Sequence, residues 1–90
     1  MDATLKAQWV AALRSGAYRQ GRVSLYTPGD DTYCCLGVLC KIAGGSPKEA
    51  SGYSITNPLL GDKIEQILWT MNDTKKKSFA EIADWIETNV

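Results

Sequence analysis

Hydrophobic positions recur with helical spacing near the N-terminus. One apolar stripe is formed by Leu5, Trp9, Ala12 and Leu13. This i, i+4, i+7, i+8 pattern is typical of a helix that buries one face. Asp2 or Thr4 can cap the start of the helix, and Gly16 can end it in a left-handed conformation. We therefore predict a core helix over about residues 2–16.

Two further helical patterns occupy the C-terminal third of the chain. DKIEQILWTMND predicts one helix with Asp62 as its cap, NDTKKK predicts a turn, and SFAEIADWIETNV predicts the last helix. The last helix opens with a capping box formed by Ser78 and Glu81. The inward-facing positions are Ile64, Ile67, Leu68 and Met71 in the first helix and Phe79, Ile82, Ala83 and Ile86 in the second.

The pattern changes to alternation in GRVSLYTPGDDTYCC, residues 21–35, and predicts a β-hairpin. Val23 and Leu25 alternate with polar residues on the first arm, and Thr32 and Tyr33 begin the second. Between the arms, TPGDD has the Pro-Gly composition of a tight turn. A two-stranded ribbon is marginal alone, so it must pack against a helix.

The run CCLGVLCKIA is too continuously apolar for an exposed strand, and it stops at GGSP. We interpret it as a short buried helix over about residues 35–43, although a buried strand has the same pattern. Gly37 within it suggests that another element crosses closely. Residues 44–61 are rich in Gly, Ser and Pro and predict a long loop that could carry a specificity-bearing surface.

These elements predict an α+β fold: a small, helix-dominated single domain over residues 1–90 with one β-hairpin. The expected order is helix, hairpin, helix, loop, helix, helix. A chain of 90 residues can form one modest hydrophobic core.

Charge and composition narrow the expected partners and location. Ten basic residues balance ten acidic ones, whereas a dedicated nucleic-acid binder usually has a basic excess and an acidic DNA mimic the reverse. No stretch approaches the roughly 18 apolar residues that span a bilayer, and the N-terminus lacks the pattern of a signal peptide. Three cysteines, an odd number, suit a reducing cytosol, so we expect a cytoplasmic protein without membrane contact.

Cys34, Cys35 and Cys40 lie within seven positions and raise the question of a reactive or metal site. A cysteine nucleophile usually needs a histidine base, and the chain has no histidine. The cysteine spacing also differs from that of zinc sites. We interpret the three as small core residues and expect no catalytic residue, metal or cofactor; redox, metal and nucleophile roles, the last at Cys35, are the alternatives.

The segment after the first helix is the best candidate for an anion site. Arg14, Tyr18, Arg19, Gln20 and Arg22 offer planar donors and an aromatic platform that would suit a phosphate or nucleotide. The alternative interpretation is a solvated turn, because isolated surface arginines are common.

A second candidate surface would bind a partner chain. Its residues are Tyr53, Trp69, Lys75, Lys76, Lys77 and Trp85. The two tryptophans either close the last two helices together or form exposed anchors, and a homo-oligomer is a further possibility. The same two helices have the outline of a helix-turn-helix, but acidic Glu81, Asp84 and Glu87 would repel phosphate, which favours a plain helical hairpin.

Residues 9–43 and 71–87 contain WVAALRSGAYRQGRVSL, YCCLGVLCKIA and MNDTKKKSFAEIADWIE. In these motifs the chain resembles a family of small proteins encoded by tailed bacteriophages and prophages. Val23 stands where the family's Q-G-x-G-x-L form has glycine. The resemblance implies a phage origin and the bacterial host cytoplasm.

Small phage accessory proteins often antagonise host defence, so we expect a non-enzymatic protein that binds and inhibits a host factor, as a counter-defence component. The first alternative is an oligomeric sponge that sequesters a nucleotide-type signalling molecule through the anion-site residues. The second is a DNA-binding regulator built on residues 62–88.

Overall fold

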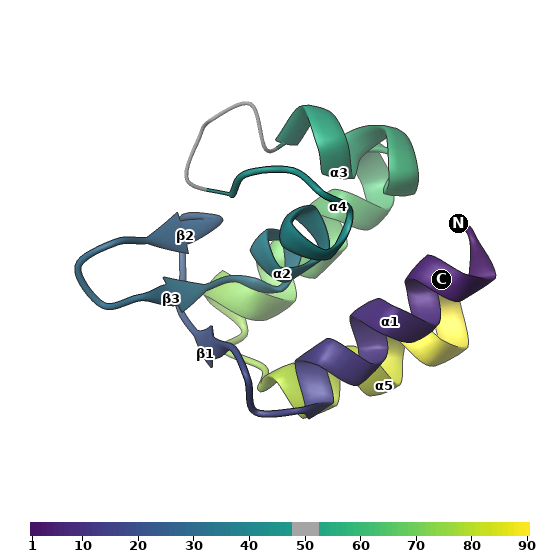
Figure 1. Cartoon of the computed structure of the whole chain (residues 1–90). Helices are drawn as coiled ribbons and strands as arrows, with labels where there is room; N and C mark the ends of the chain where they lie inside the picture. The colour runs from purple at the N-terminus through teal and green to yellow at the C-terminus, as the bar shows by residue number, and fades with distance from the viewer. Residues whose placement is uncertain (48–52) are drawn as a thin grey trace.

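The computed structural model describes residues 1–47 and 53–90, with all of their side chains except those of Tyr53 and Ser54 (Figure 1). The elements run α1 (Ala3–Arg14), β1 (Arg19–Gln20), β2 (Tyr26–Thr27), β3 (Thr32–Tyr33), α2 (Cys35–Ile42), α3 (Tyr53–Leu60), α4 (Asp62–Trp69), the π-helical turn η2 (Thr70–Thr74) and α5 (Phe79–Asn89). This is the expected small α+β fold dominated by helices.

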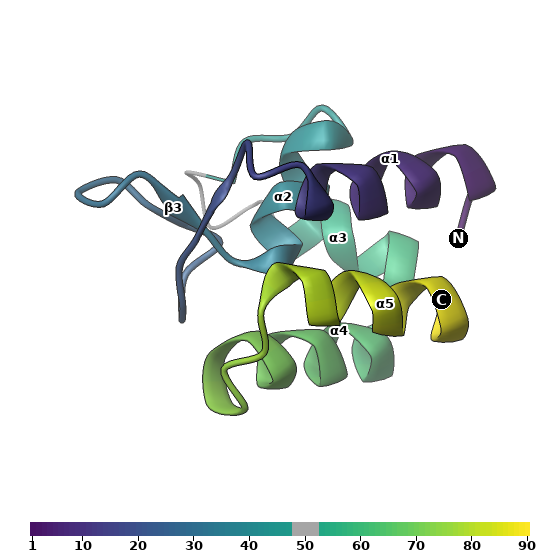
Figure 2. The same cartoon turned by 90° about the horizontal axis from the view of Figure 1, so that it is seen from below.

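Helix α2 is the centre of the molecule because every residue from Cys35 to Cys40 is buried. Helices α1 and α5 lie side by side with both chain termini at the same end, and α3 and α4 lie on the other side of α2 (Figures 1 and 2). The indole Nε1 of fully buried Trp9 donates to the Cys35 carbonyl at 3.0 Å, which ties α1 to the start of α2.

The ends of α1 and α5 form as their sequences predict. The Asp2 carboxylate accepts from the Leu5 backbone N–H at 2.8 Å, and Gly16 follows the helix with φ 77°. Ser78 and Glu81 make the reciprocal capping box at the start of α5. The predicted inward residues of α5 are all buried.

The short sheet has the strand order β1-β3-β2. The predicted hairpin is confirmed as the antiparallel pair β2–β3, and β1 adds a parallel partner that sequence reasoning missed, because two residues carry no periodicity. Val23 departs from the predicted alternation. It lies outside the strands with φ 76° and 78% of its surface exposed, whereas Leu25 is 4% exposed.

The prediction that another element crosses closely at Gly37 is confirmed. A Cβ atom at this position would lie 1.9 Å from the Leu25 carbonyl oxygen. The chain entering β2 therefore packs directly on the backbone of α2, and only glycine leaves room for it.

The predicted loop over 44–61 is wrong for its second half, where α3 forms from Tyr53 to Leu60; residues 48–52 lie outside the described part. Contacts with α4 hold this helix: the Thr56 hydroxyl donates to Glu65 at 2.6 Å, and Asn57 Nδ2 donates to Asp62 at 2.6 Å. Gly61 is the N-cap of α4 and Asp62 is its first residue, so the prediction of Asp62 as the helix cap is also wrong.

Candidate functional site

A buried amide joins the C-terminal half of the chain to the first strand. Asn72, in η2, is fully buried. Its Oδ1 accepts from Gln20 Nε2 at 2.9 Å and from the Cys35 backbone N–H at 3.3 Å. Its Nδ2 donates to the Gly21 carbonyl at 2.8 Å and to Asp73 Oδ1 at 2.8 Å. All four hydrogen-bonding positions of the amide are used, which fixes its orientation.

The π-helical turn explains why two adjacent polar residues serve this site. The Lys75 N–H donates to the Thr70 carbonyl at 2.9 Å, five residues back, so the helix widens where α4 ends. This turn directs Asn72 into the interior and leaves Asp73 half-buried beside it. Wide turns of this kind are found mostly as single insertions, frequently at functional sites.

Asp73 holds a strained segment that we call the Val23 loop, Gly21–Ser24. Asp73 Oδ1 accepts from the Val23 backbone N–H at 2.9 Å. For a β-branched residue the left-handed φ of Val23 is an outlier. It costs about 1–2 kcal/mol relative to ordinary backbone. Gln20 Nε2 also donates to the Lys77 carbonyl at 2.7 Å. The chain before Val23 is therefore hydrogen-bonded to the residue that precedes the N-cap Ser78.

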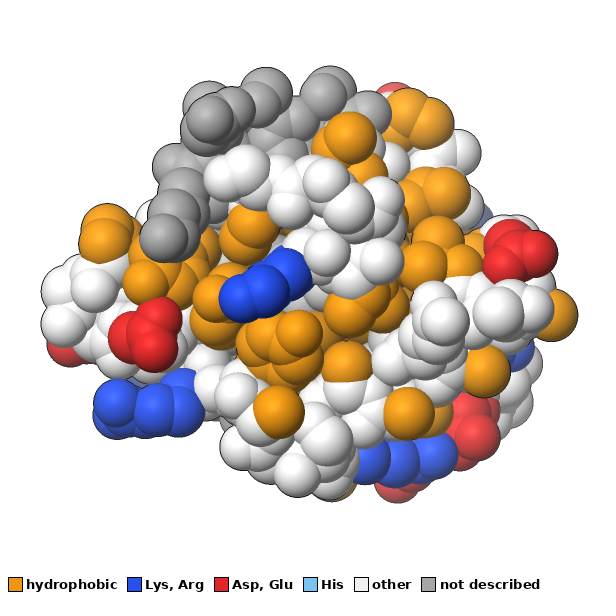
Figure 3. All heavy atoms as spheres, in the orientation of Figure 1, with side chains coloured by type: hydrophobic (Ala, Val, Ile, Leu, Met, Phe, Trp, Pro, Cys, Tyr) orange, Lys and Arg blue, Asp and Glu red, His pale blue; other side chains and the backbone are white. Residues whose placement is uncertain are grey.

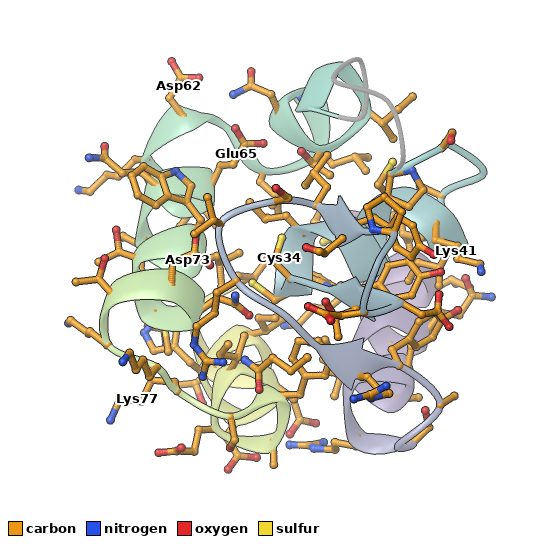
Figure 4. The ribbon with its side chains drawn as sticks, turned by 90° about the vertical axis from the view of Figure 1, so that its left-hand side faces the viewer. Cys34, Lys41, Asp62, Glu65, Asp73 and Lys77 are labelled. Atoms are coloured by element: carbon orange, nitrogen blue, oxygen red, sulfur yellow. The ribbon has the colours of Figure 1, made fainter. Side chains whose placement is uncertain are left out.

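These bonds create an exposed surface from two distant parts of the sequence. The chain from Gln20 to Val23 runs beside the chain from Asn72 to Lys77. We call the exposed residues on these two segments the Val23 surface: Arg22, Val23, Thr74, Lys75 and Lys76. Figure 4 shows Asp73 and Lys77 on one side of this view and Lys41 at the opposite edge. The Val23 surface therefore contains one exposed aliphatic side chain and three cations, of which Lys75 also lines a hollow beside α4.

The three cysteines are buried, which confirms their prediction as core residues. Burial raises the pKa of the Cys34 thiol to about 11 and that of Cys35 well above its usual value, and the nearby Asp73 carboxylate adds to both shifts. Burial also raises the pKa of Cys40. Thiols in this state are protonated at neutral pH, so they pack as small hydrophobes in the core, with Cys34 and Cys35 near Asp73.

The five residues of the predicted anion site have separate partners. Arg14 pairs with Glu87 and Asp84 on α5, which raises the pKa of Arg14 and lowers that of Glu87. Arg19 Nη1 donates to the Asp30 carbonyl at 3.3 Å. Gln20 belongs to the Asn72 network, Tyr18 packs edge-on against Tyr33, and Arg22 lies on the Val23 surface. The structure therefore does not bring the five residues of the predicted anion site together.

Tyr18 instead belongs to an aromatic cluster capped by a lysine that sequence reasoning missed. Lys41 Nζ donates to the Tyr33 hydroxyl at 3.2 Å and lies 5.8 Å from the Tyr18 ring centroid and 5.4 Å from that of Tyr33. Tyr26 packs against Tyr33 with 4.8 Å between centroids. The hydrogen bond from Lys41 to Tyr33 raises the pKa of Lys41. This contact holds α2 against the sheet.

The residues of the predicted partner surface are also divided. Lys75 and Lys76 lie on the Val23 surface, and Lys77 is half-buried beside it, with its carbonyl bonded to Gln20. Trp69 is 41% exposed. Trp85 is half-buried and packs against the core. The side chain of Tyr53 lies outside the described part.

The site therefore unites members of both predicted sets and adds residues that sequence reasoning missed. The Asn-Asp pair at 72–73, inside an otherwise helical pattern, and Val23, at a position expected to be glycine, were the available signals.

The described residues contain neither a metal-binding cluster nor a membrane-spanning helix. Within residues 1–47 and 53–90, no group of three or more His, Cys, Asp or Glu side chains is placed to hold a metal ion. No helix in the same part of the chain is both long and apolar enough to cross a bilayer.

Comparison with known proteins gives a family relationship. The model of the family described as "Domain of unknown function (DUF8296)" matches residues 1–51, more than half of the chain. No curated protein and no solved structure matches. The matched part includes α1, the sheet, the Val23 loop and α2, whereas Asn72 and Asp73 come from the remainder of the chain.

Proposed function

The chain belongs to the DUF8296 family, and we propose that it is a phage accessory protein that binds a host protein through the Val23 surface and inhibits it. The inhibition takes place in the bacterial cytoplasm, and the target belongs to an antiviral defence system. The phage origin rests on the resemblance of the CCLGVLC and SFAEIADWIE motifs to small phage and prophage proteins.

The backbone at Val23 is the observation that supports a binding role most directly. An aliphatic side chain with 78% exposure adds little to the core, and its left-handed backbone lowers stability. Asp73, itself bonded to buried Asn72, nevertheless holds the loop in this conformation. Strain retained by a dedicated network is typical of ligand and partner contacts. A loop held in place before binding also loses less entropy when it binds.

The charges beside Val23 define the chemistry of the partner. Arg22, Lys75 and Lys76 are exposed, and the carboxylate of Asp73 is turned to the loop backbone. An apolar contact with cations around it fits a protein surface that has a small apolar depression and an acidic rim. Such a rim would attract the Val23 surface at long range and fix its orientation on binding.

The test is native capture from the bacterial host with tagged wild-type protein and a Val23→Glu variant, followed by mass spectrometry of proteins and extracted small molecules. We expect a host protein in near-stoichiometric amount with the wild type and at least a tenfold loss with Val23→Glu, because the new carboxylate would face an acidic rim. Gln8→Glu is the matched control, since Gln8 is exposed on α1, and it should capture the same protein undiminished.

Other outcomes contradict the proposal. A host protein captured equally by wild type, Val23→Glu and Gln8→Glu would place the interface elsewhere. A bound nucleotide without a protein partner would instead support the signal-sequestering alternative, for which Arg22 is the predicted anion-site residue that lies on the Val23 surface.

A further inference from the structure

The outer side of α4 and the start of η2 carry polar side chains that converge on one hollow. Lys63, Gln66, Ile67 and Thr70 follow one side of a helix, at positions i, i+3, i+4 and i+7. Together with Lys75 they line a hollow of about 250 Å³, which we call the α4 hollow. Its lining therefore consists of two ammonium groups, an amide, a hydroxyl and one aliphatic side chain.

The π-helical turn η2 brings the second lysine to this face. Along an α-helix, a residue five positions after Thr70 would lie about 140° around the axis from it. In η2 the Lys75 N–H instead donates to the Thr70 carbonyl at 2.9 Å, so Lys75 comes next to Thr70 and lines the α4 hollow. Turns of this kind occur frequently at functional sites. The irregularity that directs Asn72 into the interior therefore also completes the α4 hollow.

The acidic side chains of α4 and η2 are turned to other partners. Asp62 and Glu65 accept hydrogen bonds from side chains of α3, and Asp73 accepts one from the backbone of the Val23 loop. In Figure 4, Asp62 and Glu65 lie at the end of α4 next to α3. None of the three lines the α4 hollow. The lining therefore contains cations and no carboxylate of these two elements.

The polar groups of the α4 hollow also have no partners of their own. Among the residues that the structure describes, neither Lys63 nor Lys75 forms an ion pair, and the side chains of Gln66 and Thr70 form no hydrogen bond. The arrangement differs toward the lower right of Figure 3, where α1 and α5 lie: basic and acidic side chains adjoin there, and Arg14 pairs with two carboxylates. A hollow lined by charges of one sign attracts ions of the opposite sign.

We propose that the α4 hollow binds a phosphate dianion, either free or as the terminal group of a small phosphate ester. Such a group carries a charge of about −1.5 to −2 at neutral pH and has three strong acceptor oxygens. These match two lysines and two neutral donors, whereas a carboxylate has one charge and two oxygens. The volume of about 250 Å³ is below the roughly 300–1,000 Å³ of sites that enclose a drug-sized ligand. The α4 hollow therefore fits the phosphate group alone, and this binding does not depend on the proposed host-protein contact.

The test is a titration with inorganic phosphate at constant ionic strength and about pH 7.5, where phosphate is largely dianionic, followed by backbone amide NMR shifts. We expect saturable shifts in α4 and η2. Lys63→Gln and Lys75→Gln should each weaken phosphate binding by at least about fivefold, because each removes one of two charges. Lys76→Gln is the matched control, since Lys76 does not line the α4 hollow, and it should change binding by less than about twofold. All three lysines are exposed, so these substitutions leave the core unchanged.

Adenosine monophosphate, adenosine and acetate complete the test. Adenosine monophosphate should shift the same amides as phosphate, and adenosine should not; tighter binding of the ester than of phosphate identifies an ester as the ligand, and equal binding identifies the free ion. The proposal is overturned if no shift saturates up to about 50 mM phosphate, well beyond millimolar affinity. Shifts of the same size with acetate, or equal losses in all three lysine variants, would also overturn it, because either result means diffuse attraction of anions to a basic surface.

Discussion

Two residues determine the structure of the candidate site, and each has its own effect on the stability of the fold. Val23 takes a left-handed backbone at the surface, and Asn72 is an amide with 0% exposure in the interior. The first lowers stability, and the second is tolerated because its hydrogen bonds are complete. Substitution at these two positions should therefore shift stability in opposite directions.

Replacing Val23 with glycine should stabilise the protein. Glycine adopts φ 76° without a Cβ clash, so the strain disappears, although the more flexible unfolded chain offsets part of the gain. We expect a gain of about 1 kcal/mol in the free energy of unfolding. That gain corresponds to about 4–8 °C in the midpoint of a thermal melt. Val23→Ala is the control, since it removes the branched side chain but keeps a Cβ, and it should recover less.

Replacing Asn72 with alanine should destabilise the protein strongly. The substitution leaves the Gly21 carbonyl and the Cys35 N–H without their partner in a buried site. We expect a loss of about 3 kcal/mol in urea unfolding. Asn89→Ala is the control, because it removes an exposed side-chain hydrogen bond to the Trp85 carbonyl. It should change the free energy of unfolding by less than about 0.5 kcal/mol. Equal losses of unfolding free energy in the two variants would mean that the buried hydrogen bonds of Asn72 contribute no more to stability than the exposed one of Asn89.

At the scale of the elements, α2 and the chain entering β2 approach each other closely at Gly37. Gly37→Ala should destabilise the fold by about 2 kcal/mol or more, because the new methyl group would meet the Leu25 carbonyl at 1.9 Å. Helix propensity alone predicts the opposite sign, a gain of about 1 kcal/mol. Gly29→Ala, in the hairpin turn, meets nothing within 4 Å and should be nearly neutral in the same chemical-denaturation measurement.

The capping box of α5 makes the stability of the fold depend on pH in the acidic range. The Glu81 carboxylate accepts hydrogen bonds from the Ser78 backbone and hydroxyl, which holds its pKa below the ordinary 4.5. The folded pKa lies below the unfolded one, so this contribution is present above pH 4.5 and disappears as pH falls through the folded pKa. The pairing of Glu87 with Arg14 acts in the same direction.

Glu81→Gln tests this dependence. Glutamine can still close the capping box but does not titrate. Urea unfolding at a series of pH values between about 6 and 3 should give a shallower loss of stability for the variant than for the wild type. Parallel curves would show that the Glu81 carboxylate does not contribute to the acid sensitivity.

The elements also show where sequence reasoning works. The stripe around Trp9, the capping box at Ser78 and the apolar run of α2 are local signals, and the structure follows them. Helix α3 was missed because its side-chain bonds to α4, such as Thr56 to Glu65, outweigh a loop-like composition. The strand β1 depends on its pairing with β3 and has no signal of its own.

For a similar reason, only part of the candidate site could be predicted from the sequence. Gln20, Arg22 and the lysines at 75–77 were identified as two separate groups by their chemistry. What joins them is Asn72, whose partners Gln20 and Gly21 are 52 and 51 residues away in the chain. Contacts at such separations leave no periodicity, so the Asn72 network could not be predicted, whereas valine at a position expected to be glycine was a signal of the strain at Val23.

For the whole molecule, binding and rigidity belong to different parts of the fold. The Val23 loop, held between the sheet and η2, is proposed to bind the host protein. The buried α2 helix carries the three cysteines and packs against the chain entering β2, and it supplies the rigid centre beside which the loop is held.

If the Val23 loop is kept strained for binding, the Val23→Gly variant should gain stability and lose binding together. Thermal melting and host-protein capture should be measured side by side for wild type and Val23→Gly. We expect the variant to melt higher by about 4–8 °C and to capture less of the target, because the contact side chain is gone and the loop is freer. Capture of the target by Val23→Gly at the wild-type level, whatever its melting temperature, would show that the strained loop is not needed for binding.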